Sequence, residues 1–202
     1  MTYLVSDFSR GTDEWSVVEA GKQEMSSAAF DPFKKFIKLQ SVEQSSFFVA
    51  PPRFVGDQRK SYNQELRFRL KIGVDDIGPR ASADDLVIEG GGAQPISLSV
   101  PITAQNNPLP SKEMQEYTFK LHENPEFGWT PSLSPWAFMA ILSNITSIKV
   151  KGSYVPNGKG FFDEFVLETA EYGGSGKPAT WVEKCECPKV VIVRNKNYSR
   201  SN

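Results

Sequence analysis

The chain has 202 residues, enough for one sizeable hydrophobic core or two small ones, and hydrophobic residues make up 39% of it, which excludes global disorder. Lysine and arginine total 23 against 24 acidic residues, and the net charge of -1 gives no electrostatic attraction toward nucleic acid or anionic lipid. Binding to a polyanion would need a local basic patch, which the sequence does not display.

Segments in which every second residue is apolar recur along the chain and predict half-buried antiparallel strands. The clearest lies at Leu66–Ile72, where cations fill all of the alternate positions. Other apolar stretches are short enough to be strands. In chain order, strands are expected in Trp15–Val18, Phe36–Leu39, Phe47–Ala50, Leu66–Ile72, Leu86–Ile88, Ile96–Val100, Tyr117–Leu121, Ile148–Lys151 and Phe161–Leu167.

Glycine and proline residues separate these segments, as at Pro51-Pro52, Gly78-Pro79 and Pro156-Asn157-Gly158. The run Gly90-Gly91-Gly92 is followed by neither a Lys-Ser/Thr pair nor a helical pattern, so it predicts a hairpin or bulge and not a phosphate-binding loop. Many short strands divided in this way predict an all-β fold, an antiparallel β-sandwich or jelly roll.

One short helix is expected after Ser134. The Ser134 hydroxyl can cap a helix, Pro135 suits the first helical position, and Phe138, Ile141 and Leu142 would share one face. We expect two turns that close one part of the sandwich.

The glycine-rich segment near the C-terminus predicts a domain boundary. Residues 1–172 form the expected sandwich, and residues 173–180 read as a flexible linker. No run of about 18 apolar residues is present, and the N-terminus lacks the features of a signal peptide, so no membrane insertion is predicted. If the chain is an internal module, any signal peptide belongs to its parent.

Enzymatic chemistry finds little support in the sequence. His122 is the single histidine, and it reads as an ordinary surface residue. The acidic pairs Asp75-Asp76 and Asp84-Asp85 consist of adjacent residues whose side chains point apart, so we interpret them as solvated loop acids and not as a catalytic pair. The sequence therefore predicts no catalytic residue.

Some residues are candidates for binding or modification. Trp129 and Trp136 lie in segments where exposure is plausible, and exposed rings can stack on sugars, although core packing is the commoner role of aromatic residues. The sequons at Asn144 and Asn197 could each accept a glycan in the secretory pathway. Asn144 is the stronger candidate because it follows the expected helix.

Cys185 and Cys187 lie one residue apart, a spacing that makes a disulfide between them sterically poor. Their partners are then elsewhere, and free thiols or half of a zinc site are the alternatives that the spacing leaves open.

Several phrases taken together resemble laminin domain IV, also called the laminin B domain, of laminin chains and perlecan. Any one phrase is weak, and the specificity comes from their order over roughly residues 40–188. The last of them looks like the start of a laminin-type EGF-like repeat at residues 181–188. The phrases are Ala50–Gln58, Ser61–Phe68, Asp85–Gly90, Tyr117–Leu121, Gly160–Leu167 and Trp181–Pro188.

The resemblance implies several properties. In the family the domain interrupts an EGF-like repeat, so Cys185 and Cys187 would form disulfides with cysteines outside this chain. The family's sandwich is similar to galactose-binding-like jelly rolls of carbohydrate-binding modules, many of which hold a structural calcium, and Asp7 and Asp163 are best placed to match it. Ordinary surface acids are the alternative. No other cofactor is implied.

The tail at residues 189–202 departs from the family's pattern, which continues with glycines and more cysteines. Either this tail is foreign to the family or the member is truncated, and both alternatives stay open.

The resemblance predicts a non-catalytic structural module of a secreted basement-membrane glycoprotein in the extracellular matrix. It would space neighbouring EGF-like repeats and offer a surface to other matrix proteins, and by itself it would be a monomer. The alternative is a carbohydrate-binding module with a calcium-stabilised jelly roll.

Overall fold

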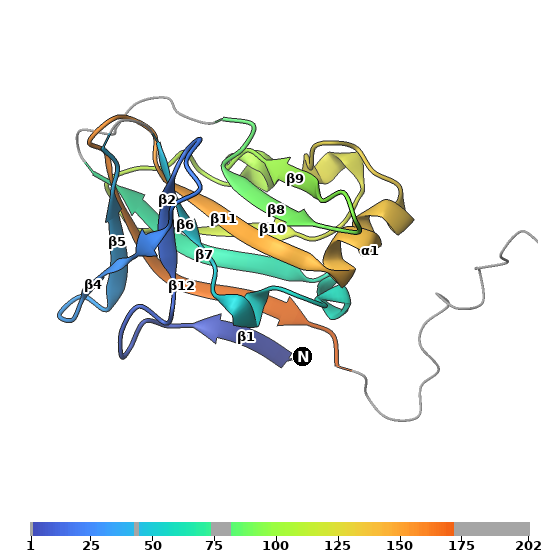
Figure 1. Cartoon of the computed structure of the whole chain (residues 1–202), viewed down its shortest axis with the longest axis horizontal. Coiled ribbons are helices and arrows are strands. Elements are labelled where there is room, and N and C mark those ends of the chain that lie inside the picture. Colours follow the sequence, from blue (N-terminus) through green and yellow to red (C-terminus); the bar gives the residue numbers. More distant parts are fainter. Residues whose placement is uncertain (1, 43–44, 74–81, 172–202) are drawn as a thin grey trace, which may run out of the picture. The chain divides into compact units, whose positions relative to one another are not determined.

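The computed structural model describes residues 2–42, 45–73 and 82–171. Within them, two antiparallel sheets pack face to face, and a short helix lies beside the second sheet (Figure 1). The predicted class, an antiparallel β-sandwich with one short helix, is confirmed.

The first sheet has six strands in the described part of the chain, in the order β10-β7-β12-β5-β4, and β1 pairs with β12 as well. Along one side of β12, its first half pairs with β5 and its second half with β1, so β5 and β1 follow one another in the same row. The strands are β1 (Thr2–Ser6), β4 (Ala29–Asp31), β5 (Phe36–Gln40), β7 (Glu65–Ile72), β10 (Gln115–Lys120) and β12 (Lys159–Thr169).

The second sheet also has six strands among the described residues, in the order β3-β2-β6-β11-β8-β9. A β-bulge shifts the register between β11 and each of its two neighbours, and such bulges increase the local twist of a sheet. The strands are β2 (Ser16–Glu19), β3 (Ser26–Ser27), β6 (Ser46–Val49), β8 (Leu86–Gly90), β9 (Ile96–Val100) and β11 (Ile145–Ser153).

Alternating hydrophobicity builds the core. In β7 every second residue is buried along the whole strand, because one face of the pleat meets the opposite sheet and the other meets water. Aromatic rings fill the centre around Phe162, whose ring centroid lies 4.9 Å from that of Trp15, 5.0 Å from that of Phe48 and 5.4 Å from that of Phe68. Each such pair contributes about 0.5–1.5 kcal/mol beyond area burial.

The predicted helix is confirmed as α1 (Pro135–Ser143). The Ser134 hydroxyl accepts a hydrogen bond from the amide of Ala137 at 3.3 Å, and the three apolar residues expected on one face are buried. Gly90 at the end of β8 permits this packing, since a Cβ there would lie 2.6 Å from the carbonyl oxygen of Ile141. None of the helices in the described residues is long and apolar enough to cross a membrane.

All nine predicted strands are confirmed, and the glycine run at 90–92 begins the hairpin turn between β8 and β9. Three strands were not predicted: β1, β3 and β4. In β1 the residues Tyr3, Leu4 and Val5 are all apolar and the buried residue is the polar Ser6, so the sequence shows no alternation of apolar and polar residues there. Its conformation depends on hydrogen bonds to β12, more than 150 residues away in sequence.

The interpretation of Asp84-Asp85 as solvated loop acids is wrong for Asp85, which is fully buried. Its carboxylate accepts hydrogen bonds from the amide of Ser82 at 2.9 Å, from the Ser82 hydroxyl at 2.8 Å and from the amide of Ile102 at 3.0 Å. The Nζ of Lys151 lies 3.4 Å from it. A buried carboxylate with this set of donors is structural.

Candidate functional site

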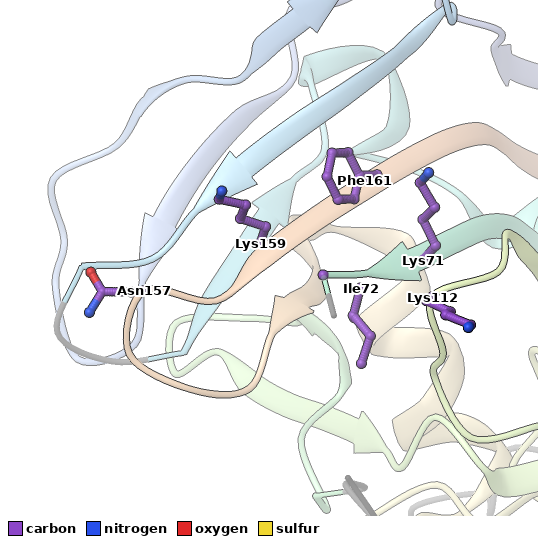
Figure 2. Close-up of a pocket in the computed structure, with 7 residues that line it drawn as sticks. Lys71, Ile72, Lys112, Asn157, Lys159 and Phe161 are labelled. Carbon is purple, nitrogen blue, oxygen red and sulfur yellow. The ribbon is translucent and has the colours of Figure 1, made fainter. Parts of the chain in front are cut away.

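A hollow of about 280 Å³ opens on the outer face of the first sheet (Figure 2). Three lysines line it: Lys71 from the end of β7, Lys159 from the start of β12 and Lys112 from the loop before β10. Phe161 and Asn157 also line it, Phe161 from β12 and Asn157 from the loop before that strand. We call this the basic hollow.

The two ends of the sandwich lie side by side. Strand β1 runs antiparallel to the end of β12, in a register that pairs Thr2 with Thr169 and Ser6 with Phe165. Residues paired in this way have Cα atoms about 5 Å apart. The chain therefore enters and leaves the sandwich at neighbouring points.

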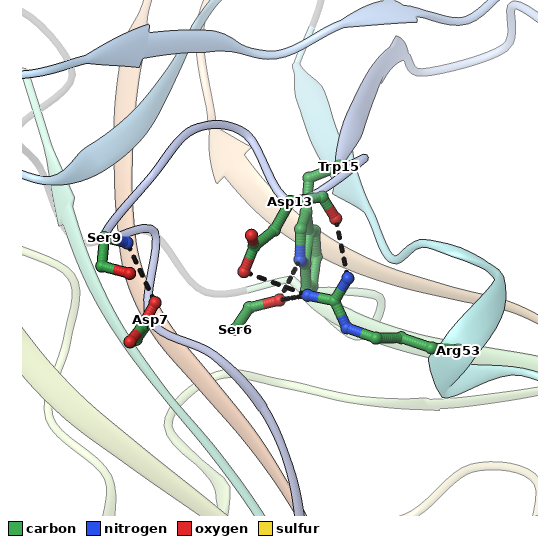
Figure 3. A network of polar contacts seen from close by, with 6 residues as sticks. All are labelled: Ser6, Asp7, Ser9, Asp13, Trp15 and Arg53. Atoms are coloured by element: carbon green, nitrogen blue, oxygen red, sulfur yellow. Dashed lines mark hydrogen bonds and ion pairs between the residues drawn. The ribbon is translucent and has the colours of Figure 1, made fainter.

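A polar network holds the first strand to the body (Figure 3). The buried hydroxyl of Ser6 accepts a hydrogen bond from Nε1 of Trp15 at 2.9 Å and another from Nη2 of Arg53. The same guanidinium donates to the backbone oxygen and to Oδ2 of Asp13, each at 3.1 Å. We call these four residues the N-terminal anchor, and it ties residues near the chain start to the 3-10 turn at Pro52–Phe54.

The sequence did not single out the anchor. Arg53 lies within one of the phrases that resemble the family, and this was the only available signal. A serine and an aspartate in turn-rich segments are too common to mark such a network.

The carboxylates proposed for calcium, Asp7 and Asp163, are close enough for the charge of Asp7 to act on Asp163. Burial raises the pKa of Asp163, although Nη1 of Arg69 donates a hydrogen bond to it at 2.9 Å. The backbone amide of Ser9 donates to Asp7 at 2.9 Å and lowers its pKa. Calcium takes six to eight oxygen ligands, so these two carboxylates could supply only part of its coordination shell. The calcium site stays a prediction.

The two candidate tryptophans differ in exposure. Trp129 is 5% exposed, its Nε1 donates to the carbonyl oxygen of Lys120 at 2.9 Å, and its ring packs near Phe119 and Phe138. The predicted exposure of Trp129 is therefore wrong, because its ring belongs to the core. Trp136 on α1 is 62% exposed.

Asn144 lies at the C-terminal end of α1 and is exposed. Its Nδ2, the atom to which a glycan would be attached, donates to the carbonyl oxygen of Gly91 at 2.9 Å. Glycosylation leaves one hydrogen on that nitrogen, so a glycan and this hydrogen bond are compatible in principle. Modification at Asn144 stays a prediction.

Other predicted features lie outside the described residues. These are Asp75-Asp76, the linker at 173–180, Cys185 and Cys187 in the EGF-like segment at 181–188, and the tail at 189–202, which contains Asn197. Within the described ranges, no group of three or more His, Cys, Asp or Glu side chains is placed to hold a metal ion.

The single histidine is only partly at the surface. The His122 side chain is 28% exposed, its Nδ1 accepts a hydrogen bond from the amide of Asn124 at 3.0 Å, and its ring centroid lies 5.3 Å from that of Tyr62. These contacts give it a packing role.

Comparisons with known proteins agree with the fold. A family model described as Laminin B (Domain IV) matches residues 47–183. The chain is 38% identical over 189 residues to laminin subunit gamma-1 of Xenopus tropicalis, covering 94% of this chain and 12% of that protein. It is 44% identical over 142 residues to laminin subunit gamma-1 of Homo sapiens, covering 70% of this chain and 8% of that protein. The chain thus spans only a small part of these relatives.

Among solved structures, the L4b domain of human laminin alpha-2 aligns with a TM-score of 0.69 over 84% of this chain and 97% of that domain, at 14% identity. At that identity the likeness shows the fold alone. The family model covers more than half of the chain and the gamma-1 relatives exceed 30% identity. The chain belongs to the laminin B (domain IV) family.

Proposed function

We propose that this chain is a non-catalytic structural module of a secreted basement-membrane glycoprotein, part of a larger assembly in the extracellular matrix. Its similarity to laminin gamma-1 subunits supports this location and this kind of parent. The observation that carries the proposal is the pairing of Thr2 with Thr169, which puts the entry and exit of the chain next to each other.

Adjacent ends define how such a module acts on its neighbours. If EGF-like segments precede and follow it, they are joined across about 5 Å, so the sandwich adds bulk at the side of the parent chain and almost no length along it. The module would then act as a spacer at the side of the parent chain, and it would not lengthen the row of EGF-like repeats. The anchor of Ser6 and Arg53 keeps the entry strand in place.

Electron microscopy of the parent protein tests this proposal. Deleting the module and joining its neighbours directly should remove a side projection and leave the length of the arm unchanged. Shortening of the arm by the length of a folded domain would contradict lateral spacing. The module alone should sediment as a monomer.

One observation supports a second function, in which an aromatic ring stacks on a neutral sugar. Trp136 is largely exposed, whereas Trp129 is in the core. A glycan array with the chain and its Trp136→Ala variant tests it, since only binding that the substitution abolishes supports a carbohydrate-binding module.

A further inference from the structure

We propose that the basic hollow and an adjoining hollow bind a sulfated sugar chain, using lysine ammonium groups for the sulfates and Phe161 for an apolar sugar face. The inference stands on the geometry of the first sheet and does not depend on the structural function proposed above. It also concerns a different surface from that of Trp136.

The adjoining hollow, of about 370 Å³, shares Lys159 and Phe161 with the basic hollow and adds Lys38 from β5. Phe161 on β12 is directly opposite Lys71 on one side and Lys38 on the other. The two hollows therefore flank β12 and together cross the four neighbouring strands β7, β12, β5 and β4, and we call them together the trough. A linear chain of sugars suits such a trough better than a compact ligand does, because small-molecule sites are enclosed and mainly apolar.

Charge in the two hollows has one sign. In the described part of the chain, their lining residues include four lysines and no aspartate or glutamate. The described carboxylates form no ion pair with any of Lys38, Lys71, Lys112 or Lys159. The chain as a whole carries a charge of -1, so this concentration of positive charge does not follow from a basic composition. Like charges gathered without ion-pair partners among the described residues favour an anionic ligand.

Two acids of the described residues that lie close to the trough are engaged elsewhere. Asp163, two residues beyond Phe161 on β12, accepts from Arg69. Asp31, the last residue of β4, has its pKa lowered chiefly by a hydrogen bond from the backbone amide of Lys34, with the charge of Lys38 as a smaller cause. The amides of Phe33 and Lys34 both donate to its Oδ1 at 3.1 Å. Neither acid lines a hollow.

An aromatic surface lies among the ammonium groups. Nζ of Lys71 is 4.8 Å from the ring centroid of Phe161 and 5.5 Å from that of Phe36, and the two rings meet edge to face at 5.3 Å. Phe161 is partly exposed, whereas Phe36 on the neighbouring strand β5 is buried. A pyranose face can pack on the accessible part of Phe161 by dispersion.

The type of cation distinguishes the ligand class. All four cations are lysines, which act as point charges, whereas flat carboxylates are best held by the two-pronged guanidinium of arginine. A sulfate ester presents several equivalent oxygens and needs no fixed approach. Sulfated sugar is therefore favoured over an acidic peptide.

The trough and the paired ends of the sandwich lie at opposite ends of β12. The trough lies at the start of β12, and the paired chain ends lie at the finish of the same eleven-residue strand, roughly 30 Å away. Neighbouring segments attached at the ends would start from the far end of the sandwich.

Isothermal titration of the full 202-residue chain with a heparin octasaccharide tests the proposal. We expect binding that weakens with salt and falls by about tenfold in the triple variant Lys71→Gln, Lys112→Gln, Lys159→Gln at about 0.15 M salt. The matched control is Lys22→Gln, Lys60→Gln, Lys120→Gln, which removes the same charge outside the trough and should bind as the original chain does.

Two further variants test the contribution of the Phe161 ring separately from that of the lysine charges, and they control for misfolding. Phe161→Leu should weaken the octasaccharide several-fold at unchanged net charge, and Lys112→Glu alone, in an exposed loop, should weaken it with an unchanged melting temperature. Equal losses in the two triple variants would overturn the proposal. So would unchanged binding in the trough variants, or equally tight binding of polyglutamate or of the desulfated octasaccharide.

Discussion

Nζ of Lys151 lies 3.4 Å from Oδ1 of Asp85, and both side chains are buried in the sandwich. The pair links β11 to the residue directly before β8. Strands β11 and β8 are hydrogen-bonded neighbours in the second sheet. The lysine ammonium group also lies near two aromatic rings, with Nζ 5.3 Å from the ring centroid of Phe47 and 5.5 Å from that of Tyr154. Removing one partner of such a pair leaves the other charge buried without its counter-ion.

We predict that Lys151→Met lowers the free energy of unfolding by about 3–5 kcal/mol, because it leaves the Asp85 carboxylate buried and unpaired. Lys149→Met is the matched control on the same strand. Lys149 pairs with Glu89 at 2.9 Å in a setting where both side chains are about a third exposed, and its loss should cost about 0–1 kcal/mol. Urea denaturation measures both, and equal effects would contradict the buried pair.

The N-terminal anchor gives a second prediction. Ser6→Ala removes the acceptor for Trp15 and Arg53 and should lower stability by about 1–3 kcal/mol. Hydrogen exchange of the β1 amides should accelerate. Ser97→Ala, at an exposed position of β9, is the control and should change neither quantity. An unchanged exchange rate in Ser6→Ala would show that strand pairing alone holds β1.

Glycosylation of Asn144 is the third prediction. Chain secreted from animal cells should carry a glycan there, detected by mass spectrometry before and after enzymatic removal. Thr146→Ala should abolish it while the Asn144 side chain remains, and Thr146→Ser should retain it. A fully unmodified secreted chain would remove this site.

The raised pKa of Asp163 predicts that the free energy of unfolding depends on pH. Its pKa is raised in the folded state, chiefly by burial, so folding disfavours the charged carboxylate. The resulting loss of stability is absent below the unfolded pKa of 3.8 and grows as pH rises through the folded value. Asp163→Asn should therefore be at least as stable as the original chain at pH 7, and its relative advantage should vanish near pH 3. A variant less stable at pH 7 would show that the bond to Arg69 dominates.

The calcium hypothesis predicts heat on titration after chelation and a higher melting temperature with calcium. Both effects should be lost in Asp7→Asn and in Asp163→Asn, whereas Asp57→Asn, at an exposed ion pair, should keep them. Absence of heat and of a melting shift in the original chain would remove the site.

Local patterns were enough to predict nine strands, the capped helix and the family. Each depends on neighbours in sequence: alternation in Leu66–Ile72 reports a half-buried pleat, and Ser134 followed by Pro135 reports a helix start. Such signals need no knowledge of what a segment packs against.

Tertiary structure alone decided the pairing of Thr2 with Thr169, the burial of Asp85 against Lys151, and the gathering of lysines from three separate segments around Phe161. These relationships depend on the order and register of strands far apart in sequence. A shift of one residue in register turns every side chain to the opposite face, so whether a lysine meets water, a carboxylate or other lysines is set only when the sheets assemble.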